Sequence, residues 1–258
     1  MKEFFGFGTG EYPYGEPGHG YLSWQHLLFV SIFTLLAVGL SIFLGLRNKN
    51  KSEKEKNKVL IWTAFLIDGF EILKIIIGSI HDPNFWKISL PLFICSVQLI
   101  TIPLAAFTKG KLKEACLDFI VIFGLVGGLG GTYGQALNFN LYPAYAWPNF
   151  VSAVTHNLSG FASLYIMISG MASLKNKTIP VTLGILIGVA IIAYTANVLI
   201  PYNYMHLMRS DGTPFIFFEQ LVNGHPVLYP MCVMSLFILY ILFFYFVAIK
   251  IKGKKAKN

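Results

Sequence analysis

Residues 23–46 read SWQHLLFVSIFTLLAVGLSIFLGL, and this stretch decides the fold class. It contains no Asp, Glu, Lys or Arg. An α-helix crosses the hydrocarbon core of a bilayer with about 20 apolar residues. The run is continuously apolar, whereas a strand of a membrane barrel would alternate between apolar and polar residues. It therefore predicts a transmembrane helix.

Further apolar runs follow along the 258-residue chain, which is 55% hydrophobic and only 12% charged. Soluble domains carry roughly 25% charged residues, so this composition excludes a soluble enzyme and a nucleic-acid binder. We predict an all-α polytopic membrane bundle that forms one domain over residues 1–258. Its seven spans are expected at 23–46, 59–80, 88–107, 115–131, 150–172, 179–200 and 229–250.

The basic residues outside the spans predict the orientation. Sixteen of them lie in 47–58, 109–113, 175–177 and 250–258, whereas the opposite side has only Lys2, Lys87 and Arg209. Cytoplasmic loops of membrane proteins are enriched in Lys and Arg. We therefore expect the N-terminus outside, the C-terminus in the cytoplasm, and the protein in a cell membrane, with the bacterial plasma membrane as the favoured location.

Polar side chains gather in the predicted outer half of the spans. At a rise of about 1.5 Å per residue, Cys95 and His156 lie at similar depths, on the order of 10 Å below the outer surface. Lys74 lies at about the same level and Glu71 slightly deeper. Ionisable residues at such depth are costly and usually face the bundle interior.

A thiol and an imidazole at one depth suggest nucleophilic catalysis. The imidazole of His156 would take the proton of Cys95, and the thiolate would attack an ester or amide carbonyl. Gln98 is three residues after Cys95 and could hydrogen-bond an oxyanion, and Asn157 could orient the His156 ring or an acyl oxygen. The alternative is structural: Cys95 as a small buried hydrophobe and His156 as a helix–helix contact.

Other polar residues form a second group of candidates. Glu71 and Lys74 are three residues apart and can neutralise one another on one side of a helix, together with Asp68. They could instead bind a lipid head group or relay protons. Tyr194 and Asn197, near the outer end of their span, are further substrate-binding candidates.

Two other motifs carry no chemistry of their own. The spacings Gly124/Gly128 and Gly127/Gly131 favour close helix packing. The three histidines His26, His156 and His225 lack the spacing of metal ligands, so we expect neither a metal ion nor a cofactor.

Three motifs resemble a known family. Residues 90–96 (LPLFICS), 155–160 (THNLSG) and 203–209 (NYMHLMR) are similar, in order and spacing, to motifs of the bacterial YwaF-type integral membrane proteins. The resemblance covers about residues 23 to 250. One departure is Phe93, where that family often has histidine. The YwaF-type proteins are related to the eukaryotic transmembrane protein 164 group, which is understood as a group of lipid acyltransferases.

This resemblance implies a lipid acyltransferase with Cys95 as nucleophile and His156 as base, and phospholipids or lyso-lipids as substrates. It adds Asn203, in the third motif, to the substrate-binding candidates. Two other functions remain open. One is a small-solute transporter or solute-binding component, in which Glu71 and Lys74 would matter more than Cys95. The other is a receptor or light sensor, which is disfavoured because span 7 offers no Schiff-base lysine before Lys250.

Overall fold

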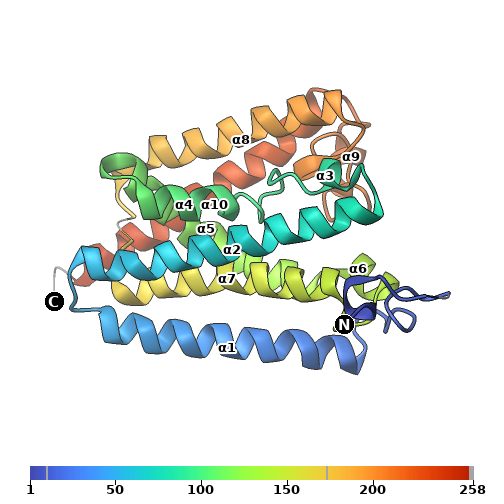
Figure 1. Cartoon of the computed structure of the whole chain (residues 1–258). Coiled ribbons are helices and arrows are strands. Elements are labelled where there is room, and N and C mark those ends of the chain that lie inside the picture. The colour runs from blue at the N-terminus through green and yellow to red at the C-terminus, as the bar shows by residue number, and fades with distance from the viewer. Residues whose placement is uncertain (10, 173, 256–258) are drawn as a thin grey trace.

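The computed structural model describes residues 1–9, 11–172 and 174–255, and this part of the chain is helical and contains no strand (Figure 1). Within it, five helices are long and apolar enough to cross a membrane. They are α1 (Trp24–Asn48), α5 (Gly110–Tyr133), α7 (Trp147–Ser169), α8 (Ile179–Leu199) and α10 (Leu228–Lys255). They correspond to five of the seven predicted spans and confirm the all-α class.

The second predicted span is the helix α2 (Glu53–His81), which has 29 residues. Its first turn is fixed by a capping box, in which the Ser52 hydroxyl accepts from the Glu55 backbone N–H and the Glu55 carboxylate accepts from the Ser52 N–H. The helix is long enough to cross a bilayer. Its membrane crossing stays a prediction, because it carries Asp68, Glu71 and Lys74 within its apolar part.

The third predicted span, 88–107, is wrong as a continuous helix. The structure has the short α3 (Phe85–Ile88), an irregular segment, and α4 (Gln98–Phe107). Pro91 is the physical reason, because proline has no N–H to donate and disfavours helical geometry in the residue before it. With ten residues, α4 is about 15 Å long, half the thickness of a hydrocarbon core.

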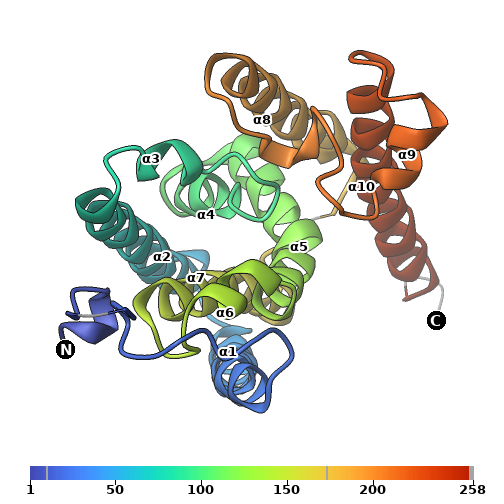
Figure 2. The same cartoon turned by 90° about the vertical axis from the view of Figure 1, so that its right-hand side faces the viewer.

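The helix α5 lies inside the bundle and packs against α4, α7 and α8 (Figure 2). Its closest partner is α7. A methyl group placed on Gly124 would lie 2.9 Å from the Ser159 carbonyl oxygen, and one on Gly128 would lie 3.0 Å from the backbone of Gly160. The predicted role of these glycines in close helix packing is therefore confirmed.

The two ends of the bundle differ in structure. One end, which we call the loop-rich end, holds residues 1–9, 11–22, 134–146 and 200–227 and appears at the right of Figure 1. The opposite end holds the short basic connections between helices. The loop-rich end also contains the short elements η1 (Glu3–Phe5), α6 (Ala136–Leu141), η3 (Tyr204–His206) and α9 (Ile216–Leu221), while η2 (Asn176–Thr178) lies at the basic end.

The N-terminal residues before α1 fold back onto the loop-rich end. Gly18 packs so tightly against α6 that a methyl group there would lie 2.2 Å from the Asn140 carbonyl oxygen. Nearby, the Tyr21 N–H donates to Asn140 Oδ1 over 2.8 Å. The ring of Phe7 stacks on His81 at the end of α2, with ring centroids 4.5 Å apart. The segment thus connects α6 with the end of α2.

Candidate functional site

Cys95 lies in the turn that leads into α4. Its Sγ is 3.9 Å from the Ser96 hydroxyl, and the backbone N–H groups of Cys95 and Ser96 also interact with the sulfur. The residue is only partly buried. Donors of this kind offset part of the cost of burying a thiolate.

His156 lies on α7 and is held by α5 and the loop that follows it. Its Nε2 is 3.0 Å from Gln135 Nε2, and Gln135 Oε1 accepts from Asn138 Nδ2 over 2.9 Å. The Gln135 amide therefore donates to Nε2. Because Nε2 accepts from this amide, the proton of the neutral ring lies on Nδ1, and the Gly127 carbonyl interacts with the ring. The ring is neutral in this arrangement, with its Nε2 lone pair directed at Gln135.

Cys95 and His156 pack against the same face of α5. A methyl group on Gly127 would lie 3.3 Å from the Cys95 Cα and Cβ, and one on Gly131 would lie 2.1 Å from the His156 Nδ1 and Cε1. Positions four apart on a helix are neighbours, about 5–6 Å between Cβ positions. The two side chains therefore lie about one helical turn apart along α5, although no hydrogen bond joins them within the described residues.

Lys74 adds positive charge to this region. Its ammonium group forms an ion pair with the buried Glu71 and interacts electrostatically with both Cys95 and His156. The structure thus brings four of the predicted residues, on α2, α7 and the turn before α4, to one place. Asp68, one helical turn from Glu71, is close enough to interact with its charge.

Gln98 follows Cys95 at the start of α4 and is fully buried. Its Oε1 accepts from the Thr101 hydroxyl over 3.0 Å, whereas its Nε2 has no hydrogen-bond partner among the described residues. An unpaired buried donor costs free energy, about 1–3 kcal/mol.

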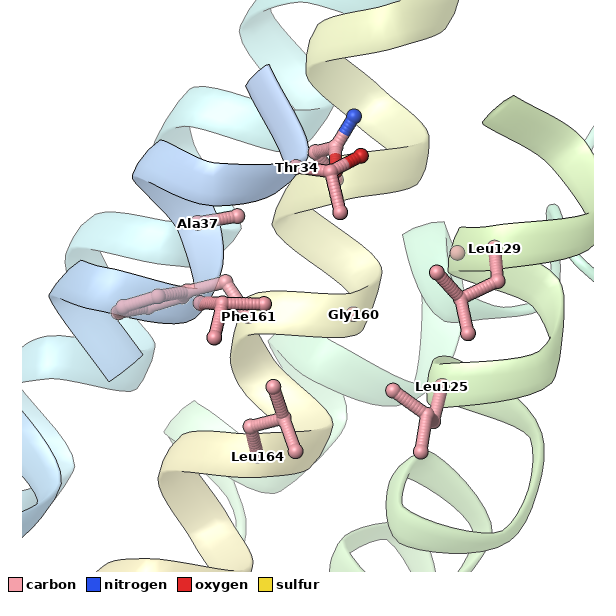
Figure 3. A pocket seen from close by; sticks show the side chains of 10 residues that line it. Thr34, Ala37, Leu125, Leu129, Gly160, Phe161 and Leu164 are labelled. Carbon is pink, nitrogen blue, oxygen red and sulfur yellow. The ribbon is translucent and has the colours of Figure 1, made fainter. Parts of the chain in front are cut away.

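Asn157 is engaged elsewhere. Its Nδ2 donates to the Ala153 carbonyl over 2.8 Å and to the Thr132 hydroxyl over 3.3 Å. It also lines a cavity of about 20 Å³ between α1, α5 and α7, next to Thr34 and Gly160 (Figure 3). A space of that size holds about one water molecule. The structure therefore places Asn157 in the packing of α7 rather than at the His156 ring.

The last three predicted residues lie around the segment after α8. Asn197 holds the backbone of Tyr204 from both sides, because its Nδ2 donates to the Tyr204 carbonyl and its Oδ1 accepts from the Tyr204 N–H. Asn203 Nδ2 donates to the Arg209 carbonyl and to Asp211 Oδ2, both over 2.7 Å. Tyr194 instead lines a separate groove between α8 and α10. Among the described residues, no hydrogen bond joins any of these three to Cys95 or His156.

The segment around Tyr204, which Asn197 and Asn203 hold in place, contacts the chain on the N-terminal side of Cys95. The Tyr204 hydroxyl donates to the Lys87 carbonyl, and the ring of Phe93 packs edge-on against Tyr204, with centroids 5.4 Å apart. The ring of His206 lies 5.8 Å from that of Phe93. A histidine from a distant segment therefore lies beside the position where the resembled family often has one.

Sequence reasoning missed two parts of the site. Gln135, the partner of His156, lies just beyond the predicted span 115–131 and resembled an ordinary loop residue. The glycines Gly127 and Gly131 were assigned to helix packing, but they also receive Cys95 and His156. The sequence signal that could have predicted this contact was the pair Gly127 and Gly131, which lies near the expected depth of Cys95 and His156. Among the described residues, no group of three or more His, Cys, Asp or Glu side chains is arranged to hold a metal ion.

These features define the class of the protein: a helical integral membrane protein with a thiol, an imidazole and an ion pair gathered beside its most buried helix. The comparison with known families is consistent with this class, because the model of the TMEM164 family matches residues 21–248. The chain belongs to the TMEM164 family. No curated protein and no solved structure matches the chain.

Proposed function

We propose that this protein is a membrane-embedded lipid acyltransferase that uses Cys95 as its nucleophile and His156 as its general base. The observation that supports it most directly is the shared packing of both side chains on the Gly127–Gly131 face of α5, beside the Lys74 ammonium. Membership of the TMEM164 family is consistent with a membrane location.

The first half-reaction forms a thioester. His156 takes the proton of the Cys95 thiol, the resulting thiolate attacks the ester carbonyl of a phospholipid, the carbon–sulfur bond forms, and the ester carbon–oxygen bond breaks. The departing lyso-lipid oxygen takes a proton from the His156 imidazolium. In the second half-reaction His156 removes the proton of an acceptor hydroxyl, whose oxygen attacks the thioester and releases Cys95.

The neighbouring polar groups support these steps. The unpaired Nε2 of Gln98 is the group that would hydrogen-bond the oxyanion. Lys74, paired with Glu71, provides a positive charge suited to a phosphate group. In the resting state Gln135 occupies Nε2 of His156, so the ring leaves this partner before it accepts a proton. Catalytic hydrogen bonds often tighten only when substrate is bound.

The expected substrates are phospholipids or lyso-lipids that enter sideways from the bilayer. With the N-terminus outside, the loop-rich end faces away from the cytoplasm, so the reaction takes place in the outer half of a cell membrane. No cofactor is required, because the thiol and imidazole supply the nucleophile and the base.

Intact-mass spectrometry tests the proposal. We expect purified protein incubated with phosphatidylcholine to gain the mass of one acyl chain, which hydroxylamine removes. Cys95→Ala should lose this adduct, while Cys232→Ala, which removes another partly accessible thiol, should keep it. An acyl adduct or acyl transfer that persists in Cys95→Ala would refute the mechanism.

A solute transporter is the second candidate, and the buried Glu71–Lys74 ion pair is the observation that favours it. Intramembrane charges often line the paths of substrates or protons. Solute uptake into proteoliposomes that survives Cys95→Ala but is lost in Lys74→Met would support the transporter. The acyltransferase proposal expects no such uptake.

A further inference from the structure

A second site lies apart from Cys95, between α8 and α10, on the side of the bundle away from α1 (Figures 1 and 2). This groove, which we call the α8–α10 groove, has a volume of about 500 Å³. Its walls are two stripes at helical spacing. On α8 they include Ile187, Ile191 and Tyr194, and on α10 Met231, Met234 and Ile238.

The groove is closed below and open toward the bilayer. Its floor contains Ala190 and Leu207, which are 7% and 2% exposed. Its rims carry Ile191 and Met231, which are 62% and 58% exposed on two helices of membrane-spanning length. An apolar ligand can therefore enter sideways from the hydrocarbon, whereas a solute in water has no direct access.

The length of the groove matches one leaflet. On α8 the lining runs from Ile187 to Thr195, and on α10 from Pro230 to Ile238. Each stripe is about 12 Å long at about 1.5 Å per residue. One leaflet contributes about 15 Å of hydrocarbon. The groove runs along the helices, and its outer boundary, Pro226 and Val227, lies at the loop-rich end.

The occupant follows from access. Lipid chains lie on the open side of the groove, and its volume of about 500 Å³ is large enough for one acyl chain. The polar lining consists of Tyr194 and Thr195, and the Thr195 hydroxyl already donates to the Ile191 carbonyl over 2.8 Å. The Tyr194 phenol, toward the outer end, makes no hydrogen bond within the described part of the chain and is available to a polar group of a ligand.

We propose that the α8–α10 groove binds one acyl chain of a glycerophospholipid from the leaflet at the loop-rich end, with the Tyr194 hydroxyl within reach of its ester group. The buried floor at Ala190 and Leu207 lets the chain lie between the two helices instead of over them. The site does not require the chemistry of Cys95. It gives Tyr194 a function that its distance from Cys95 otherwise leaves unexplained.

A matched pair of double variants tests the groove. Ile191→Trp with Met231→Trp places two indoles on its rims. Ile192→Trp with Leu239→Trp places them at residues of the same helices that are 58% and 62% exposed but lie outside it. Each protein, purified in mild detergent, is titrated with palmitoyl-oleoyl phosphatidylcholine and observed by native mass spectrometry.

We expect the wild type, the control variant and Cys95→Ala to retain one saturable phospholipid. The rim variant should bind it about tenfold more weakly or worse, because excluding even two methylene groups from burial costs about 1.6 kcal/mol. Equal retention in rim and control variants would mean ordinary boundary lipid and would overturn the proposal. The proposal would also be overturned if the wild type retained no saturable phospholipid.

Photolabelling of the wild type covers the case in which the rim variant does not fold. Phosphatidylcholine with a diazirine in its acyl chain should label Tyr194, Met231 and Met234 more than Ile192 and Leu239, and unlabelled lipid should compete. Equal labelling of the groove residues and of the two control residues would overturn the proposal. The two proposals can fail separately, because this experiment measures lipid binding. A missing acyl adduct on Cys95 would refute the acyltransferase mechanism but not the groove, and a missing lipid in the groove would refute the groove but not the mechanism.

Discussion

Gly131 leaves the space on α5 that the His156 ring occupies. A methyl group there would lie 2.1 Å from the His156 ring, so Gly131→Ala must displace the ring from Gln135 and Gly127. We expect loss of the acyl adduct on Cys95 and destabilisation of about 1–3 kcal/mol from overpacking. Intact-mass spectrometry and thermal unfolding check the two effects.

Gly130→Ala is the matched control, because a methyl group at Gly130 meets nothing within 4 Å. Alanine favours helix over glycine by about 1 kcal/mol, so this neighbour should fold at least as well as the wild type and keep its adduct. If both substitutions had the same effect, the contact between His156 and α5 would not matter for the reaction.

His206 gives the loop after α8 a pH dependence. Burial lowers the pKa of His206, and the nearby Asp211 offsets part of that shift. The unfolded histidine takes up a proton below about pH 6.5, whereas the folded one resists it. Stability contributed by this loop is therefore present at neutral pH and falls as the pH drops through the unfolded pKa.

Hydrogen exchange of residues 203–211 measures this effect. We expect faster exchange at pH 5.5 than at pH 7.5, after correction for the intrinsic rates. His206→Asn should abolish the difference, because asparagine does not titrate and tolerates the positive φ of 53° at this position. A pH effect of unchanged size in His206→Asn would assign it to another group.

At the residue scale, the sequence placed Cys95 and His156 in the same region but could not give their partners. Their depth stays a prediction, whereas the structure shows that both pack against α5, at Gly127 and Gly131. The sequence contained no information on which side chain would occupy His156 Nε2, because Gln135 lies outside any periodic segment. Asn197 and Asn203 were predicted to bind substrate, and the structure shows them hydrogen-bonded to the backbone of Tyr204 and Arg209.

At the element scale, Asp118 joins three parts of the basic end. This fully buried carboxylate on α5 accepts from the Leu174 N–H, from the Thr178 hydroxyl and from the Tyr245 hydroxyl. We expect Asp118→Asn to destabilise the protein by about 1–3 kcal/mol, because an amide cannot accept at its nitrogen and leaves a buried donor unpaired.

Glu114→Gln is the control, since Glu114 pairs with Lys177 near the same end of α5, and both side chains are more exposed. An ion pair of this kind contributes about 0–1 kcal/mol. Chemical unfolding in detergent should therefore separate the two variants. Equal losses would contradict the anchoring role of Asp118.

Helices with continuous apolar runs were predicted to within a few residues of their ends, because hydrophobic length alone specifies them. The third span was not, because hydropathy averages over Pro91 and the turn at Cys95. The irregular segment is stabilised by tertiary contacts. The ring of Phe93 packs against that of Tyr204, from a loop more than a hundred residues later, and the Tyr204 hydroxyl donates to the Lys87 carbonyl in the adjoining α3. Contacts between residues so far apart in the chain cannot be predicted from the hydropathy of a short stretch of sequence.

At the scale of the whole molecule, the predicted sidedness can be measured. With native cysteines replaced by alanine, Glu11→Cys at the loop-rich end and Lys111→Cys at the basic end place one exposed thiol on each side. We expect a membrane-impermeant maleimide to label Glu11→Cys in intact cells and Lys111→Cys only after permeabilisation, since basic loops stay in the cytoplasm. The reverse pattern would invert the orientation.

The broken third span also has a consequence for synthesis. Backbone that is not helical is tolerated at membrane depth only where protein encloses it. Residues 89–97 emerge from the ribosome long before the segment around Tyr204 that covers them. Because residues 89–97 belong to the predicted third span, we expect that the first half of the chain cannot reach its final structure in the bilayer by itself. Truncation before residue 200 should leave it bound to the insertion machinery or degraded, so that the cysteine turn is assembled only once α8 and its following loop have been made.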